Sequence, residues 1–150
     1  KVDYFICPVG GGGLMAGCCI AIKHYFEQCN IIGVEPELFN DTQLSLSKGK
    51  RVSIDINQNT LCDALMAKAP GKLTFPINQE FITEVATVNE KEIKDAMRFA
   101  YNEFNLVVEP GGIVGLAFAM KHRFSIESAN ILILLSGGNV DLDHFDELIK

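Results

Sequence analysis

The feature that most constrains this chain is a run of four consecutive glycines, Gly10 to Gly13, between an apolar segment and a helical pattern. A turn without Cβ atoms lets several backbone amides converge on one anion, and the N-terminus of the following helix adds partial positive charge. Because four successive glycines are costly in chain entropy, a turn made only for close packing is the weaker interpretation. The run therefore predicts a phosphate-binding turn. A P-loop is excluded, since no Gly-Lys-Ser/Thr follows.

Strand-like segments alternate along the chain with helical patterns, which is typical of an α/β domain. Residues 131–135 are apolar on both faces, which predicts a strand in the middle of a parallel sheet. The helix after the glycines is apolar nearly all round, which predicts that most of its surface is covered. The expected fold is therefore α/β, with three layers and a mostly parallel, twisted sheet. The expected strands are 4–9, 31–34, 81–88 and 131–135, and the expected helices are 14–26, 90–104, one that follows Pro110, and 143–149.

The length of 150 residues corresponds to one domain, and the chain carries a formal net charge of -6 with no run of basic residues. Nucleic acid and anionic membranes are therefore not expected partners, and no apolar segment approaches the roughly 20 residues of a membrane span. The five cysteines form no metal-binding pattern, so reduced thiols and a cytoplasmic location are expected. Residue 1 leads almost directly into a strand, as expected of a piece of a longer protein or of one product of a cut chain, and both interpretations stay open.

The expected strands end in unusual sequences, and in an open parallel sheet ligands bind outside the carboxyl ends of the strands. The first strand runs into the glycines, the second into Glu35, and the fourth into Ser136, so one site could use all three ends. A dinucleotide-binding, Rossmann-like module is one interpretation of this pattern. Its fingerprint would consist of Gly11, Gly13 and Ala16, with Glu35 as the ribose-binding carboxylate, but it assigns no function to the segments around Ser136 and Glu109.

Five motifs occur together in a characteristic order and spacing. In these motifs the chain resembles the serine/threonine dehydratase and serine racemase family, whose members depend on pyridoxal phosphate (PLP). This family has the tryptophan synthase β-like fold, also called fold type II. The likeness covers all 150 residues, and it implies that 1–150 is the C-terminal, cofactor-phosphate-binding part of such an enzyme, a portion of its large domain. The N-terminal, lysine-bearing half would then be absent from the chain. The motifs are Pro8-Val-Gly-Gly-Gly-Gly-Leu14, Glu35-Pro36 with Asp41, Asp63-Ala64, Glu109-Pro-Gly-Gly112 and Ser136-Gly-Gly-Asn-Val-Asp141.

The resemblance implies a set of cofactor-binding residues. Ser136 would place a neutral hydroxyl beside the pyridine nitrogen of PLP, where many other PLP enzymes have a carboxylate. Glu109 matches a glutamate near the cofactor ring, but an acidic residue before a helix that starts with proline is also an ordinary N-terminal charge. Both interpretations of Glu109 stay open. The cofactor phosphate would be held by the backbone amides of Gly10, Gly11, Gly12, Gly13 and Leu14.

The resemblance also implies a divalent cation, because racemase-type members bind one through a Glu-Pro glutamate and the residues that follow it. The ligands here would be the carboxylates of Glu35 and Asp41 and the main-chain carbonyl of Phe39. Oxygen ligands of this kind favour Mg²⁺ or Ca²⁺. The alternative is that Asp41 caps a helix beginning at Thr42.

The Schiff-base lysine of the family lies in a Ser-x-Lys-x-Arg-Gly context that no lysine of this chain has, so no catalytic residue is assigned. The expected function is that of a fragment of an L-threonine/L-serine ammonia-lyase, which performs PLP-dependent β-elimination to a 2-oxo acid and ammonia. A serine racemase-type enzyme is the alternative within the family. The expected partners are an amino-acid substrate, the missing N-terminal half and, in the complete enzyme, a second copy in a homodimer. The isolated chain is expected to be inactive.

Overall fold

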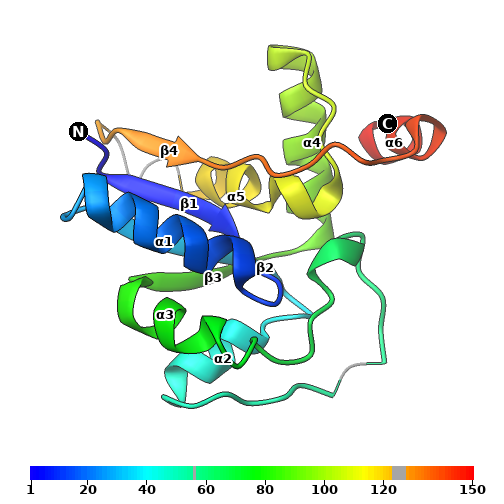
Figure 1. Cartoon of the computed structure of the whole chain (residues 1–150). Coiled ribbons are helices and arrows are strands. Elements are labelled where there is room, and N and C mark those ends of the chain that lie inside the picture. The colour runs from blue at the N-terminus through cyan, green and yellow to red at the C-terminus, as the bar shows by residue number, and fades with distance from the viewer. Residues whose placement is uncertain (56, 123–127) are drawn as a thin grey trace.

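A four-stranded, fully parallel sheet forms the centre of the protein (Figure 1). The computed structural model describes residues 1–55, 57–122 and 128–150. The strand order is β3-β2-β1-β4, and helices lie on both faces of the sheet. The expected α/β class with a parallel sheet is confirmed. The strands are β1 (Tyr4–Pro8), β2 (Asn30–Pro36), β3 (Glu84–Val88) and β4 (Ile131–Ile133).

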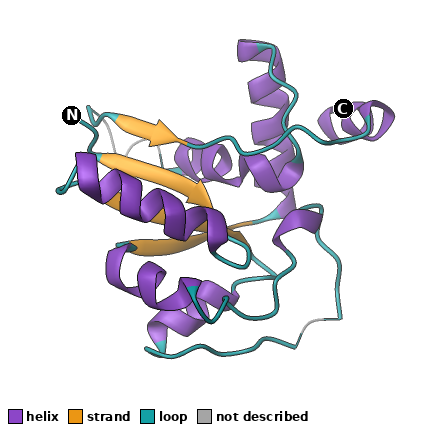
Figure 2. Ribbon diagram, in the orientation of Figure 1, coloured by secondary structure: helices purple, strands orange, loops and turns teal. Residues whose placement is uncertain are grey.

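Alternating side chains of β1 enter two separate cores, as the period of two in a strand requires. Figure 2 shows the helices that lie on the two faces of the sheet. Phe5 and Cys7 pack on the face that α1 and α3 cover, whereas Ile6 packs on the face that α5 covers, with α4 behind it. The sheet is thus the middle one of three layers. The helices are α1 (Gly13–Tyr25), α2 (Asp41–Ser47), α3 (Thr74–Phe81), α4 (Glu90–Phe104), α5 (Pro110–Lys121) and α6 (Leu142–Ile149), with a short 3-10 turn, η1 (Asp63–Leu65).

Three expectations about these elements are wrong. The strand expected to begin at Phe81 starts at Glu84, because Phe81 is the last residue of α3. Within the described residues β4 pairs with β1 alone and is an edge strand, and Leu132 on it is 44% exposed. Helix α1 is covered on one side only, since Ile20 and Tyr25 are 54% and 75% exposed. Apolar composition indicated that these segments could be buried, but it did not show what would cover them.

The topology places two of the unusual strand ends side by side. Strands β1 and β4 are parallel neighbours, with Tyr4 opposite Ile131 and Ile6 opposite Ile133, so their carboxyl ends open on the same edge of the sheet. The glycine run follows β1 and leads into α1, and the segment from Ser136 follows β4. No helix in the described ranges is long and apolar enough to cross a membrane.

Candidate functional site

A cavity of about 240 Å³ lies at the carboxyl ends of β1 and β4. The glycine run forms one wall, and Ser136 and Glu109 contribute to another. Every residue that the sequence suggested for cofactor binding lies on this cavity, although these residues come from three separate parts of the chain. The lining consists of Pro8, Gly10, Gly11, Gly12, Gly13, Leu14, Met15, Ala64, Leu65, Glu109, Gly111 and Ser136.

The glycines of the run are needed for two different reasons. Gly12 has a φ of 86°, in the left-handed region, and a Cβ atom on it would lie 2.6 Å from Nδ2 of Asn78. Cβ atoms on Gly11 and Gly13, by contrast, would meet no atom within 4 Å. Gly12 therefore makes the turn and its close approach to α3 possible, whereas Gly11 and Gly13 leave the cavity open to a ligand.

The amides at this turn are free to bind an anion. Within the described residues, the amides of Gly10, Gly11 and Gly12 donate no hydrogen bond to the protein. The first bond of α1 runs from the amide of Ala16 to the carbonyl of Gly12, which leaves the earlier helical amides without intrahelical acceptors. The first turn of α1 carries no acidic residue that would offset its partial positive charge. Unpaired amides, a helix N-terminus and open space together make an arrangement that suits an anion, called the cradle below.

Glu109 anchors the loop that carries Ser136. Its Oε2 accepts a hydrogen bond from the amide of Asn139 at 3.0 Å, and its own amide donates to the carbonyl of Gly137 at 3.2 Å. Gly137 has a φ of 120°, and a Cβ atom there would lie 2.5 Å from Oε1 of Glu109. Glu109 is the residue before α5, but its side chain accepts no capping bond from that helix. The contacts of the carboxylate therefore fix the strand-ending loop rather than the helix start.

Sequence reasoning missed the residues that lie behind the glycine turn. The hydroxyl of Thr74 donates to the carbonyl of Gly11 at 2.8 Å, and the amide of Gly71 donates to the same carbonyl at 3.0 Å. Nδ2 of Asn78 donates to the carbonyl of Gly12 at 3.3 Å. No local signal could have found these contacts, because 60 or more residues separate the two partners of each.

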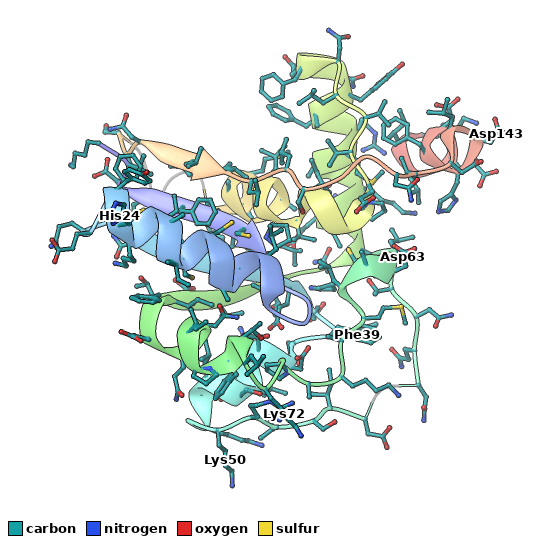
Figure 3. The ribbon with its side chains drawn as sticks, viewed as in Figure 1. His24, Phe39, Lys50, Asp63, Lys72 and Asp143 are labelled. Carbon is teal, nitrogen blue, oxygen red and sulfur yellow. The ribbon has the colours of Figure 1, made fainter. Side chains whose placement is uncertain are left out.

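The residues expected to bind a metal lie together but away from the cavity, around the end of β2 and the start of α2. The carboxylate of Glu35 accepts the amides of Thr42 and Gln43, each at 2.9 Å, so Glu35 caps α2. Helix α2 begins at Asp41 itself, which makes no side-chain cap, so the expectation that Asp41 caps a helix beginning at Thr42 is wrong. Phe39, which lies in the short loop between β2 and α2, is also buried (Figure 3).

Asp41 is the unusual member of this group. It is completely buried, and neither of its carboxylate oxygens has a hydrogen-bond partner among the described residues. Burial raises the pKa of Asp41 to about 7 and the pKa of Glu35 to about 8. The described residues contain no cluster of three or more His, Cys, Asp or Glu side chains suited to a metal ion.

The dinucleotide-binding interpretation does not fit this arrangement. It requires the Glu35 carboxylate to face a bound ribose, but Glu35 is completely buried and its two oxygens are bonded to α2. Glu35 also does not line the cavity that contains Gly11 and Gly13. The strand end at Glu35 therefore holds the start of α2 and does not belong to the cavity. The expectation that one site uses all three strand ends is wrong.

The lysines of the chain all belong to the described residues, and none of them lines the cavity. Lys50 extends from the surface near α2, and Lys72 lies in the loop before α3 (Figure 3). The cavity thus contains a place for an anion and a hydroxyl, but no amine from this chain. That a lysine from elsewhere completes the site stays a prediction.

Comparison with known proteins gives matches along almost the whole chain. A family model described as "Pyridoxal-phosphate dependent enzyme" matches residues 1–137. The L-threonine ammonia-lyase of Thermotoga maritima is 35% identical over 99% of this chain and 37% of its own length. The serine racemase of Schizosaccharomyces pombe is 37% identical over 97% of this chain and 45% of its own length.

Comparison with solved structures also gives matches along almost the whole chain. A threonine deaminase from T.th. superimposes with a TM-score of 0.90 and 34% identity, over 95% of this chain and 48% of that protein. Maize serine racemase superimposes with a TM-score of 0.87 and 35% identity, over 98% of this chain and 47% of that protein. The chain therefore spans less than half the length of each of these four proteins.

Proposed function

The chain belongs to the family of pyridoxal-phosphate-dependent enzymes of fold type II, and from that premise we propose that it is the cofactor-phosphate-binding part of an L-threonine or L-serine ammonia-lyase. The complete enzyme would eliminate the β-hydroxyl group of its substrate and release a 2-oxo acid and ammonia. Relatives with both threonine ammonia-lyase and serine racemase names support the substrate class, a hydroxyl-bearing amino acid.

The observation that carries the proposal is the fit of the cradle to a phosphate group. Gly11 and Gly13 leave open space on the cavity side, and the amides beside them lack acceptors in the described structure. A phosphate dianion would accept hydrogen bonds from these amides and would gain further from the N-terminus of α1. The residues present therefore suit the phosphate end of PLP.

Ser136 would receive the other end of the cofactor. Its loop shares the cavity with the glycine turn and is held by Glu109. When bound, PLP supplies an electron sink for negative charge that develops on the α-carbon of the substrate. A serine hydroxyl does not fix a proton on the ring nitrogen, so Ser136 would make this sink weaker than a carboxylate would. A weaker sink suits β-elimination, because the departing hydroxyl group carries charge away.

The remaining parts of the enzyme are proposed to lie outside the chain. A lysine in the rest of the protein would bind PLP and exchange protons at the α-carbon of the substrate. The length of the relatives supports such a second part, because each of those described above is more than twice as long as the aligned segment. We further propose a homodimer and a cytoplasmic location for the complete enzyme.

Serine racemase activity is the second candidate, and the buried carboxylate of Asp41 favours it. Asp41 has no hydrogen-bond donor for either oxygen in the described structure, and a divalent cation would supply the missing partner. Mg²⁺ or Ca²⁺ would then bind between Asp41, Glu35 and the main-chain carbonyl of Phe39. If the site exists, either ion raises the melting temperature of the complete gene product, and Asp41→Asn abolishes that gain.

Assays on the complete gene product test the function. We expect 2-oxo acid and ammonia from L-threonine or L-serine, and D-serine if racemisation dominates. PLP should raise the melting temperature by mass action, whereas NAD⁺ should not. Thermal protection by NAD⁺ but not by PLP would overturn the proposal. The 150-residue chain alone should show no turnover.

A further inference from the structure

We propose that Thr74 and Asn78 on α3 are positioning residues, which hold two carbonyls of the glycine turn away from the cavity and thereby aim its amides at the cofactor phosphate. The inference rests on the proposed function, because it assumes that a phosphate occupies the cradle. It assigns to α3 a role in the site that neither the glycine motif nor the family match contains.

The hydrogen bonds behind the turn carry this inference. The carbonyl of Gly11 accepts from the Thr74 hydroxyl at 2.8 Å and from the Gly71 amide at 3.0 Å. The carbonyl of Gly12 accepts from Nδ2 of Asn78 at 3.3 Å and from the first bonded amide of α1. Two consecutive carbonyls of a flexible turn thus each have two donors, so their direction is fixed.

Peptide geometry transmits this direction to the amides. A trans peptide group is planar, and its C=O and N–H bonds point in opposite directions. The carbonyl of Gly11 shares a peptide group with the amide of Gly12, and the carbonyl of Gly12 shares one with the amide of Gly13. Holding both carbonyls toward α3 therefore turns these two amides to the opposite side, where the cavity lies.

The placement of the two side chains fits this role. Thr74 and Asn78 are four residues apart on α3, so they lie on one face of the helix, above each other along the turn. Asn78 is completely buried, and its Oδ1 has no partner among the described residues. A buried amide is costly unless it is hydrogen-bonded, and the bond from Asn78 to Gly12 offsets part of that cost.

Neither side chain lines the cavity, so each would act through the turn and not by touching the ligand. Loss of either bond should weaken binding of the phosphate group and leave the contacts of the pyridine ring unchanged. A role in folding alone would weaken both equally or neither.

The test compares PLP with pyridoxal, which lacks the phosphate, in equilibrium dialysis with the complete gene product. Thr74→Val removes the hydroxyl at nearly constant volume, and Asn78→Leu removes the amide. Each should weaken PLP binding by about two- to tenfold, the equivalent of one hydrogen bond. Pyridoxal binding should change by less than about twofold, and Thr74→Ser should restore PLP binding. The ³¹P chemical shift of bound PLP should move in Thr74→Val and not in Thr74→Ser.

Thr83→Val is the matched control, because the Thr83 oxygen accepts the amide of Ile31 at 3.1 Å, next to the amino-terminal end of β3. It should leave the ratio of the two dissociation constants unchanged, even if it lowers the melting temperature. If the wild-type protein binds PLP no better than pyridoxal, the proposed function fails. If it prefers PLP and both Thr74→Val and Asn78→Leu keep that preference in full, the positioning role is refuted.

Discussion

Gly12→Ala is expected to destabilise the fold strongly, although it adds only one methyl group. Gly12 has a φ of 86°, and a left-handed conformation costs a residue with a Cβ atom about 1–2 kcal/mol. The new Cβ would lie 2.6 Å from Nδ2 of Asn78 and 3.0 Å from Oγ1 of Thr74. Overpacking of this kind costs about 1–3 kcal/mol. The two effects together remove about 2–5 kcal/mol, a large part of the stability of a typical domain.

Thermal unfolding followed by circular dichroism measures this loss. For a chain of this size about 1 kcal/mol shifts the melting temperature by about 2–4 °C, so Gly12→Ala should lower it by about 4–20 °C. Gly11→Ala and Gly13→Ala are matched controls, because their Cβ atoms meet nothing within 4 Å and neither position has a positive φ. Both should melt at or above the wild-type temperature while binding PLP more weakly. Equal melting temperatures for all three variants would refute the reasoning.

Three further predictions concern other side chains of the site and the core. Ser136→Ala removes one hydrogen bond to the cofactor, so it should weaken PLP binding by at most about tenfold. It should lower the turnover of the complete gene product by a larger factor. Glu109→Ala should lower the urea midpoint by freeing the Ser136 loop, whereas Glu109→Gln, which keeps an acceptor, should retain most of it. Burial raises the pKa of Cys19 and of Cys62 to about 12, so at pH 8 iodoacetamide should label both thiols, as seen by mass spectrometry, only after unfolding.

Local sequence was sufficient for the elements whose cause is local. The glycine run ended β1 and began α1 as expected, and the proline of α5 stands at its first turn. The position of a strand within the sheet could not be predicted from local sequence. The apolar residues 131–135 indicated a strand that is buried on both faces. In the described sheet, however, β4 pairs with β1 alone and therefore lies at an edge. Composition does not encode that pairing.

The site divides in the same way. The glycine run and Ser136, which face the cavity, carry signals that can be recognised in the sequence. Thr74 and Asn78, which hold the glycine turn in place, carry none. Thr74 is an ordinary helix-start residue, and Glu109 was equally explained as a helix charge until its carboxylate was seen to bind Asn139. Asp41 shows the reverse error, since an acidic residue at the start of a helix need not cap it.

Two walls of the cavity are built by the same device. On one side α3 binds the carbonyls of the glycine turn, and on the other the carboxylate of Glu109 binds the amide that ends the Ser136 loop. In both cases a side chain from a distant part of the chain binds a polar backbone group of a loop beside the cavity and thereby fixes the position of that loop. Because a phosphate gains most from amides that need no reorganisation when it binds, this arrangement matters more to affinity than the number of glycines. A protein with the four glycines but without α3 behind them would have the motif without the cradle.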